Sequence, residues 1–337
     1  MKRSNYNIEI LRCWLMFLIV LMHCATFIDT GNHDRARLIH VFCIFSVNAF
    51  VLISGWFGIK FSWRKVVKLL GLGLFAAIVL FLLSPFASGN WQFAYDLGWF
   101  GCAYLGLLFF SPILNAAIEH LRGESERTLR VVWSVYACAM AISWLPLDGL
   151  GIHLHIRGWE AHSFNQLCFM YLTGRVLVKC EWVNTIRIRS LFVWTIGLMG
   201  VNYAWALAAG LTRGNAFLQT LLVGTRGYNN PLIILLAIGV FLLFVRGRFP
   251  HWLGRTAAFA GPSMFTVYLL HEATNHELSV ALYNRYLLPW HPAGGVVAQF
   301  FALLLSAALI YTVCVLFDLC RRAGLCILEK KRGVLCH

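Results

Sequence analysis

The chain has 337 residues, of which 60% are hydrophobic and only 12% are charged, and its mean hydropathy is +0.71. This composition excludes an ordinary soluble globular domain and predicts an integral membrane protein in contact with lipid. The net charge of +14 would suit nucleic acid, but the basic residues flank apolar segments, so we expect no nucleic-acid partner.

Apolar segments follow one another along the whole chain. The last of them has no Asp, Glu, Lys or Arg from Gly294 to Phe317 and could cross roughly 30 Å of hydrocarbon as a helix, whereas barrel strands would be shorter and alternating. The sequence therefore predicts an all-α, polytopic membrane helix bundle. Ten transmembrane helices are expected, near residues 8–28, 38–58, 66–84, 99–118, 129–146, 163–180, 190–210, 229–246, 256–273 and 294–317.

The basic residues divide unevenly between the two sides of this bundle. With a cytoplasmic N-terminus, the outer side holds only Arg35, Arg37, Arg157, Arg213, Arg226 and Arg285, and the other lysines and arginines, except Arg12, lie at the inner ends. This distribution predicts that both termini are cytoplasmic. We expect a transmembrane domain of residues 1–318, whose first apolar run is a span rather than a cleaved signal peptide, and a basic cytoplasmic tail of residues 319–337.

The first predicted helix carries two groups that are costly in lipid, Arg12 and His23. At about 100° per residue, their separation brings the two side chains back to within roughly 20° of each other, about 16 Å apart along the axis. They therefore share one face and predict a polar passage along it. Alternatively, Arg12 snorkels to the inner headgroups beside Glu9, and His23 makes an ordinary interhelical contact.

A basic run, "FSWRKVVKLL", follows the second predicted helix and places Arg64, Lys65 and Lys68 within about one turn at the cytoplasmic rim. Several converging cations bind phosphate well, so the run predicts docking of a phosphorylated cytosolic cofactor. Anchoring to anionic lipid explains the same charges and stays open as an alternative.

These features resemble the acyltransferase-3 family of bacterial membrane acyltransferases over nearly the whole chain. The matching positions are Arg12 and His23; Phe50, Ile53, Ser54 and Gly55; Phe61, Arg64, Lys65 and Lys68; Trp99, Phe100, Tyr104 and Pro112; Tyr171 and Gly174; and Ser263, Tyr268 and His271. Lys65 and Lys68 stand where the family usually has arginine, and Gly71 stands where it often has proline. We expect a stand-alone member, without the soluble hydrolase-like domain that some members carry.

The resemblance implies transfer of an acyl group, most often acetyl, from cytosolic acyl-CoA to a hydroxyl group of an envelope polysaccharide or its lipid-linked precursor. It also implies a bacterial inner-membrane location and no permanently bound cofactor, with acyl-CoA, most simply acetyl-CoA, as co-substrate. Arg64, Lys65, Lys68 and Arg12 would hold the phosphates of CoA. His23 would act as general base or would itself carry the acyl group.

Other side chains are candidates for supporting roles. A tetrahedral oxyanion could be stabilised by Asn48, Ser54, Tyr268 or His271, although polar groups between membrane helices often only bond each other. The acceptor could be bound by His153, Arg157 and Trp159 of an outer loop, although an interfacial aromatic belt also explains the tryptophan.

Two other functions remain open at this point. A transporter or export factor for a polar or anionic solute is compatible with an intramembrane Arg and His, although the sequence lacks inverted-repeat symmetry. The same fold could also acylate a small hydroxylated metabolite. No metal site is expected, because His271 and His276 of "HEATNHE" lie roughly 140° apart around a helix and do not converge.

Overall fold

The computed structural model describes residues 3–27, 33–144, 162–178, 180, 182–211, 227–273, 276–291 and 295–331, and every regular element in these ranges is helical. The helices are α1 (Arg3–Phe27), α2 (His33–Cys43), α3 (Phe45–Phe57), α4 (Trp63–Ser88), α5 (Gly98–Glu124), α6 (Glu126–Trp144), α7 (Phe164–Leu177), α8 (Trp182–Thr185), α9 (Ile188–Leu211), α11 (Pro231–Arg246), α12 (His251–Ala260), α13 (Met264–Tyr268), α14 (His276–Tyr286) and α15 (Val296–Lys331). Short turns η3 (Gly261–Ser263), η4 (Leu269–Ala273) and η5 (Leu288–Trp290) complete them. The all-α class is confirmed for this part of the chain.

Among the described residues, six helical segments are long and apolar enough to cross a membrane. They are Tyr6–Phe27, Leu38–Phe57, Trp63–Ser88, Gly98–Glu124, Ile188–Ala208 and Val296–Ile327. Large apolar side chains on their outer faces are exposed rather than packed, as in a protein that is solvated by lipid; examples are Leu74, Ile78, Leu82, Phe192, Trp194, Phe301 and Leu305. The chain is a multi-pass membrane protein.

The other four expected spans are also helical, as α6, α7, α11 and the segment from α12 to η4, but each is shorter or less apolar than the six. The count of ten spans and the cytoplasmic termini therefore stay predictions. The expected domain boundary at residue 318 falls inside a helix, because α15 runs unbroken from Val296 to Lys331.

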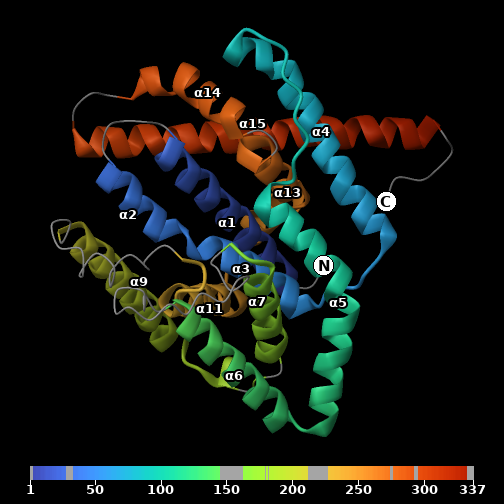
Figure 1. Cartoon of the computed structure of the whole chain (residues 1–337), viewed down its shortest axis with the longest axis vertical. Helices are drawn as coiled ribbons and strands as arrows, with labels where there is room; N and C mark the ends of the chain where they lie inside the picture. Colours follow the sequence, from blue (N-terminus) through green and yellow to red (C-terminus); the bar gives the residue numbers. More distant parts are fainter. Residues whose placement is uncertain are drawn as a thin grey trace.

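α1 lies at the centre of the molecule (Figure 1), where it contacts α2, α3, α11, α12, α13, α14 and α15. Its apolar side chains are buried on several faces, and Leu11, Leu15 and Val20 have no exposed surface at all. Because neighbouring helices surround α1, His23 is held inside the protein, whereas the Arg12 side chain keeps 36% of its surface exposed.

α3 and α7 approach most closely where two glycines meet. A side chain at Gly55 would overlap the carbonyl oxygen of Tyr171, and a Cβ atom at Gly174 would lie 2.6 Å from the carbonyl oxygen of Leu52. Small residues let two helix backbones come this close inside a membrane protein. α7 therefore supports one face of α3, while other side chains of α3 face a cavity.

Candidate functional site

A cavity of about 480 Å³ lies between α1, α3, α4, α5 and the segment around α13. From α1 it is lined by Arg12, Met16, Ile19, Met22 and His23, which follow one another at intervals of one to four residues along one helical face. The predicted shared face of Arg12 and His23 thus corresponds to one wall of a single cavity. Its size lies within the range typical of small-molecule sites.

Three cations line the cavity, and the part that they line is called its cationic end. Lys65 and Lys68 of α4 line the cavity together with Arg12, whereas Arg64 is exposed and does not. Arg12 Nη1 forms an ion pair with Glu9 Oε1 at 2.8 Å, and Lys65 Nζ donates to the carbonyl oxygen of Lys60 at 2.6 Å. In the described part of the chain no carboxylate pairs with either lysine, so both charges are available to an anionic ligand.

A closed ring of hydrogen bonds fixes the chain that leads into this cationic end. Gly58 ends α3 with a φ of 73°, a conformation that favours glycine. The next residue, Ile59, donates its N–H to the Tyr171 hydroxyl at 3.0 Å, and that hydroxyl donates to Asn115 Oδ1 at 2.6 Å. Asn115 Nδ2 donates back to the carbonyl oxygen of Ile59 at 2.8 Å. The ring sets where α4 begins and hence where its lysines lie.

At another point on the cavity wall, His23 is paired with a second histidine. His23 Nδ1 lies 2.7 Å from Nε2 of His271, and His271 Nδ1 lies 2.7 Å from the carbonyl oxygen of Val267. The two ring centroids are 4.9 Å apart and the rings are inclined by 23°, so the imidazoles meet edge to edge with the hydrogen bond close to both ring planes. His23 lines the cavity, while His271 is 1% exposed and lies behind it.

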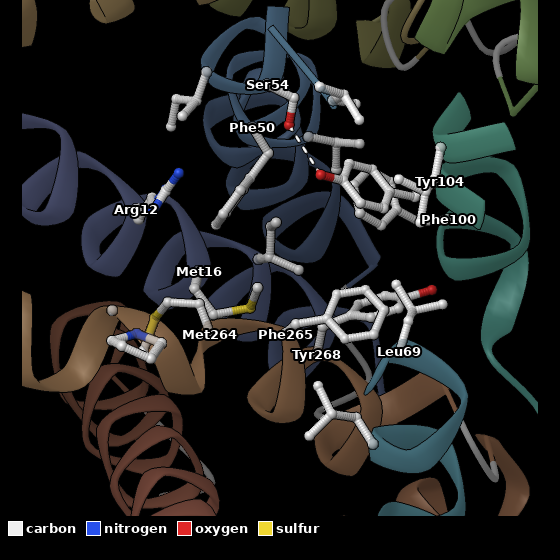
Figure 2. A pocket seen from close by; sticks show the side chains of 18 of the residues that line it. Arg12, Met16, Phe50, Ser54, Leu69, Phe100, Tyr104, Met264, Phe265 and Tyr268 are labelled. Atoms are coloured by element: carbon white, nitrogen blue, oxygen red, sulfur yellow. Dashed lines mark hydrogen bonds between the residues drawn. The ribbon is translucent and has the colours of Figure 1, made fainter. Parts of the chain in front are cut away.

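Side chains with hydroxyl groups from α3, α5 and α13 also line the cavity (Figure 2). Ser54 Oγ of α3 lies 3.3 Å from the Tyr104 hydroxyl of α5, so these two groups satisfy each other. Tyr268 is 5% exposed and lines the cavity, and its buried hydroxyl lies near the backbone N–H groups of Phe100 and Gly101 and donates to none of the described residues. Its ring centroid is 6.2 Å from that of His271. The proton of the Tyr268 hydroxyl is therefore not used by any described residue, while the oxygen packs against the start of α5.

Asn48 lies apart from the cavity wall in a buried amide network. Its Nδ2 donates to the carbonyl oxygen of Tyr228 at 2.8 Å, and its Oδ1 accepts from Gln166 Nε2 at 3.2 Å. Both polar atoms are already engaged, so Asn48 holds the Tyr228 backbone in place while the Tyr228 side chain lines the cavity.

The remaining sequence predictions divide into two groups. The outer-loop candidates His153, Arg157 and Trp159 lie outside the described residues. His271 and His276 do not converge, because His276 Nδ1 pairs with Glu272 Oε1 at 3.2 Å while His271 bonds His23.

Sequence reasoning missed the pairing of the two histidines and the place of Tyr228 in the wall. His23 and His271 are 248 positions apart, so no periodic pattern could connect them. The available signal was only that each is a lone imidazole in an apolar segment.

These observations define a helical membrane protein whose interior cavity is lined by three cations and a histidine. Comparison with known protein families matches residues 5–319 to the acyltransferase-3 family, described as an acyltransferase domain. The chain therefore belongs to the acyltransferase-3 family and is a membrane acyltransferase. No curated protein and no solved structure matches it.

Proposed function

We propose that this protein transfers an acyl group, most simply acetyl, from cytosolic acyl-CoA to a hydroxyl group of a cell-envelope polysaccharide or its lipid-linked precursor. The observation that carries the proposal is that Arg12, Lys65, Lys68 and His23 all line one cavity. CoA carries its phosphates at one end and its thioester at the other, so a donor held by the cations can extend its thioester toward the imidazole.

The proposed topology places the cationic end at the cytoplasm, where acyl-CoA is found. It requires a bacterial inner membrane, ten spans and cytoplasmic termini, in keeping with the excess of basic residues at the predicted inner ends. Arg64 is exposed outside the cavity, where it can bind the outermost phosphate of CoA or anionic headgroups.

The chemistry that we propose is direct transfer with His23 as general base. The unprotonated ring nitrogen of His23 removes the proton of the acceptor hydroxyl while its oxygen bonds to the thioester carbon. The resulting oxyanion accepts a hydrogen bond from the Tyr268 hydroxyl, whose proton is not donated to any described residue. The carbon–sulfur bond then breaks, and the CoA thiolate takes the proton from His23, which leaves an ester and a free thiol.

The test is a transfer assay in membranes that contain the protein, with radiolabelled acetyl-CoA and the envelope glycan of the host. Wild type should form an alkali-labile labelled ester, and His23→Gln should lose about 10²- to 10⁴-fold in rate, the usual contribution of a general base. His120→Gln is the matched control, because His120 is exposed and does not line the cavity.

Three outcomes contradict the proposal in different ways. Equal labelling by His23→Gln excludes this histidine as the base. Labelling of a small hydroxylated metabolite but not of the glycan excludes the proposed acceptor. Movement of a polar solute across the membrane without any ester, and without dependence on acetyl-CoA, indicates a transporter instead.

A further inference from the structure

The buried histidine behind His23 fixes where the protons of the pair must be. A carbonyl oxygen cannot donate, so His271 Nδ1, which lies 2.7 Å from the carbonyl oxygen of Val267, must carry a proton. A neutral imidazole has only one N–H group, so His271 Nε2 then holds a lone pair. That lone pair faces His23 Nδ1 at 2.7 Å, so His23 must donate through Nδ1.

This chain of bonds leaves one nitrogen of the pair free. With its proton on Nδ1, a neutral His23 has its lone pair on Nε2, and none of the described residues bonds to that atom. The opposite arrangement, in which His271 donates to His23, requires a second proton and a positive charge on a ring that is 1% exposed. Burying such a charge is costly, and no ion pair in the described part of the chain contains His271.

We infer that His271 is a positioning residue that holds His23 as its Nδ1–H tautomer, with the Nε2 lone pair kept available as the base. The inference rests on the proposed function for its catalytic consequence, but not for the tautomer itself. His271 plays the part that a carboxylate plays in many catalytic pairs, as a neutral acceptor in place of an anion. A neutral acceptor suits an apolar site because it needs no buried negative charge.

The local fold explains why His271 can do this. α13 passes into the π turn η4, which widens the helix, and π turns often occur at functional sites. Within it the His271 ring reaches back to the carbonyl oxygen of Val267, while the Tyr283 hydroxyl of α14 donates to the carbonyl oxygen of His271. Both the ring and the backbone of His271 are therefore held, so the acceptor nitrogen has a fixed direction.

The experiment compares His271→Gln with His271→Leu in the transfer assay, with acyl-CoA varied. A glutamine amide can donate to Val267 and accept from His23, so it should keep activity within a few-fold of wild type. Leucine has no acceptor and should lower kcat about 100-fold, with the KM for acyl-CoA unchanged, because the tautomer is no longer held. If His271 only filled space, leucine would be the better substitute, and that order of activities overturns the inference.

A second measurement reads the tautomer without any turnover. Nitrogen-15 spectra of ring-labelled histidine, compared between wild type and His23→Gln, should assign the His23 proton to Nδ1; in His271→Leu the Nε2–H form should appear. A wild-type signal for Nε2–H overturns the inference even if the enzyme is active. A signal for Nδ1–H in a protein without transferase activity leaves the tautomer standing and overturns only the proposed function.

Discussion

The cationic end of the cavity and its histidine pair are built in opposite ways. Lys65 and Lys68 are exposed, and among the described residues Lys65 bonds only to a backbone oxygen, so neither side chain is tightly held. By contrast, His23 and His271 form two successive bonds of 2.7 Å that end on a backbone carbonyl. One part of the cavity presents mobile charge, and the other presents a fixed lone pair.

The difference fits the two tasks of the proposed reaction. A donor that arrives from water must exchange its hydration shell for protein contacts, and long flexible cations can follow a phosphate during that exchange. Proton removal instead depends on geometry, since a base must lie within hydrogen-bond reach of one particular hydroxyl. Substitutions at the cationic end should therefore change donor binding, and substitutions at the histidine pair should change the chemical step.

Tyr268→Phe should have the largest of the effects considered in this comparison. It removes only the hydroxyl, so kcat should fall about 10²- to 10³-fold, as for the loss of an oxyanion donor, while the KM for acyl-CoA stays constant. The same change should alter thermal stability little, because the buried hydroxyl donates to none of the described residues. Steady-state kinetics and a melting curve measure the two quantities.

Tyr104→Phe is the matched control, because the Tyr104 hydroxyl lines the same cavity but is already bonded to Ser54. It should reduce kcat much less than Tyr268→Phe. Equal losses in the two variants would mean that Tyr268 has no special role in the transition state.

Charge reversal at the cationic end should change the KM for acyl-CoA rather than kcat. Lys65→Glu with Lys68→Glu should raise the KM for acyl-CoA about 100-fold, at roughly tenfold for each exposed cation, and leave kcat at saturating donor unchanged. Added salt should raise the KM of wild type more than that of the variant, since salt screens the attraction that the variant lacks. The measurement is initial rate against acyl-CoA concentration at two ionic strengths.

Arg64→Glu tests whether the phosphates of acyl-CoA bind inside the cavity or outside it. Arg64 is the neighbour of Lys65 but does not line the cavity. Its charge reversal should therefore raise the KM for acyl-CoA less than the single variants Lys65→Glu and Lys68→Glu do. If Arg64→Glu has the largest effect of the three, the phosphates bind outside the cavity.

The sequence predicts the elements of this site better than it predicts their assembly. Periodicity places Arg12 and His23 on one face because both belong to one helix. The basic run at the start of α4 is visible in the sequence itself. The histidine pair depends on packing between α1 and the segment around η4, and no local rule gives that contact. Asn48 shows the same limit, because its position in an apolar segment predicts a supporting role at the site, and only the packed structure reveals that both of its polar atoms are engaged in a buried network.

The same limit applies to the fold. Hydropathy finds the long helices, but the span predicted at residues 256–273 is not one continuous α-helix, because it contains a 3-10 turn at Gly261–Ser263 and the π turn η4. Proline at position 262 signals the first break because it lacks an N–H group. The π turn has no comparable marker in the sequence.

Gly174→Ala tests what both parts of the cavity share, which is the support of α3 by α7. A Cβ atom there would lie 2.6 Å from the Leu52 carbonyl oxygen and 2.8 Å from the Trp56 nitrogen, so the helices must separate. The cost should be about 1–3 kcal/mol of stability, and KM and kcat should change together rather than separately.

Gly71→Ala is the control, because a Cβ atom at Gly71 has no neighbour within 4 Å and alanine favours the helix there. A melting temperature for Gly174→Ala equal to that of Gly71→Ala would show that this contact does not hold α3, and the position of its cavity-lining residues would need another support.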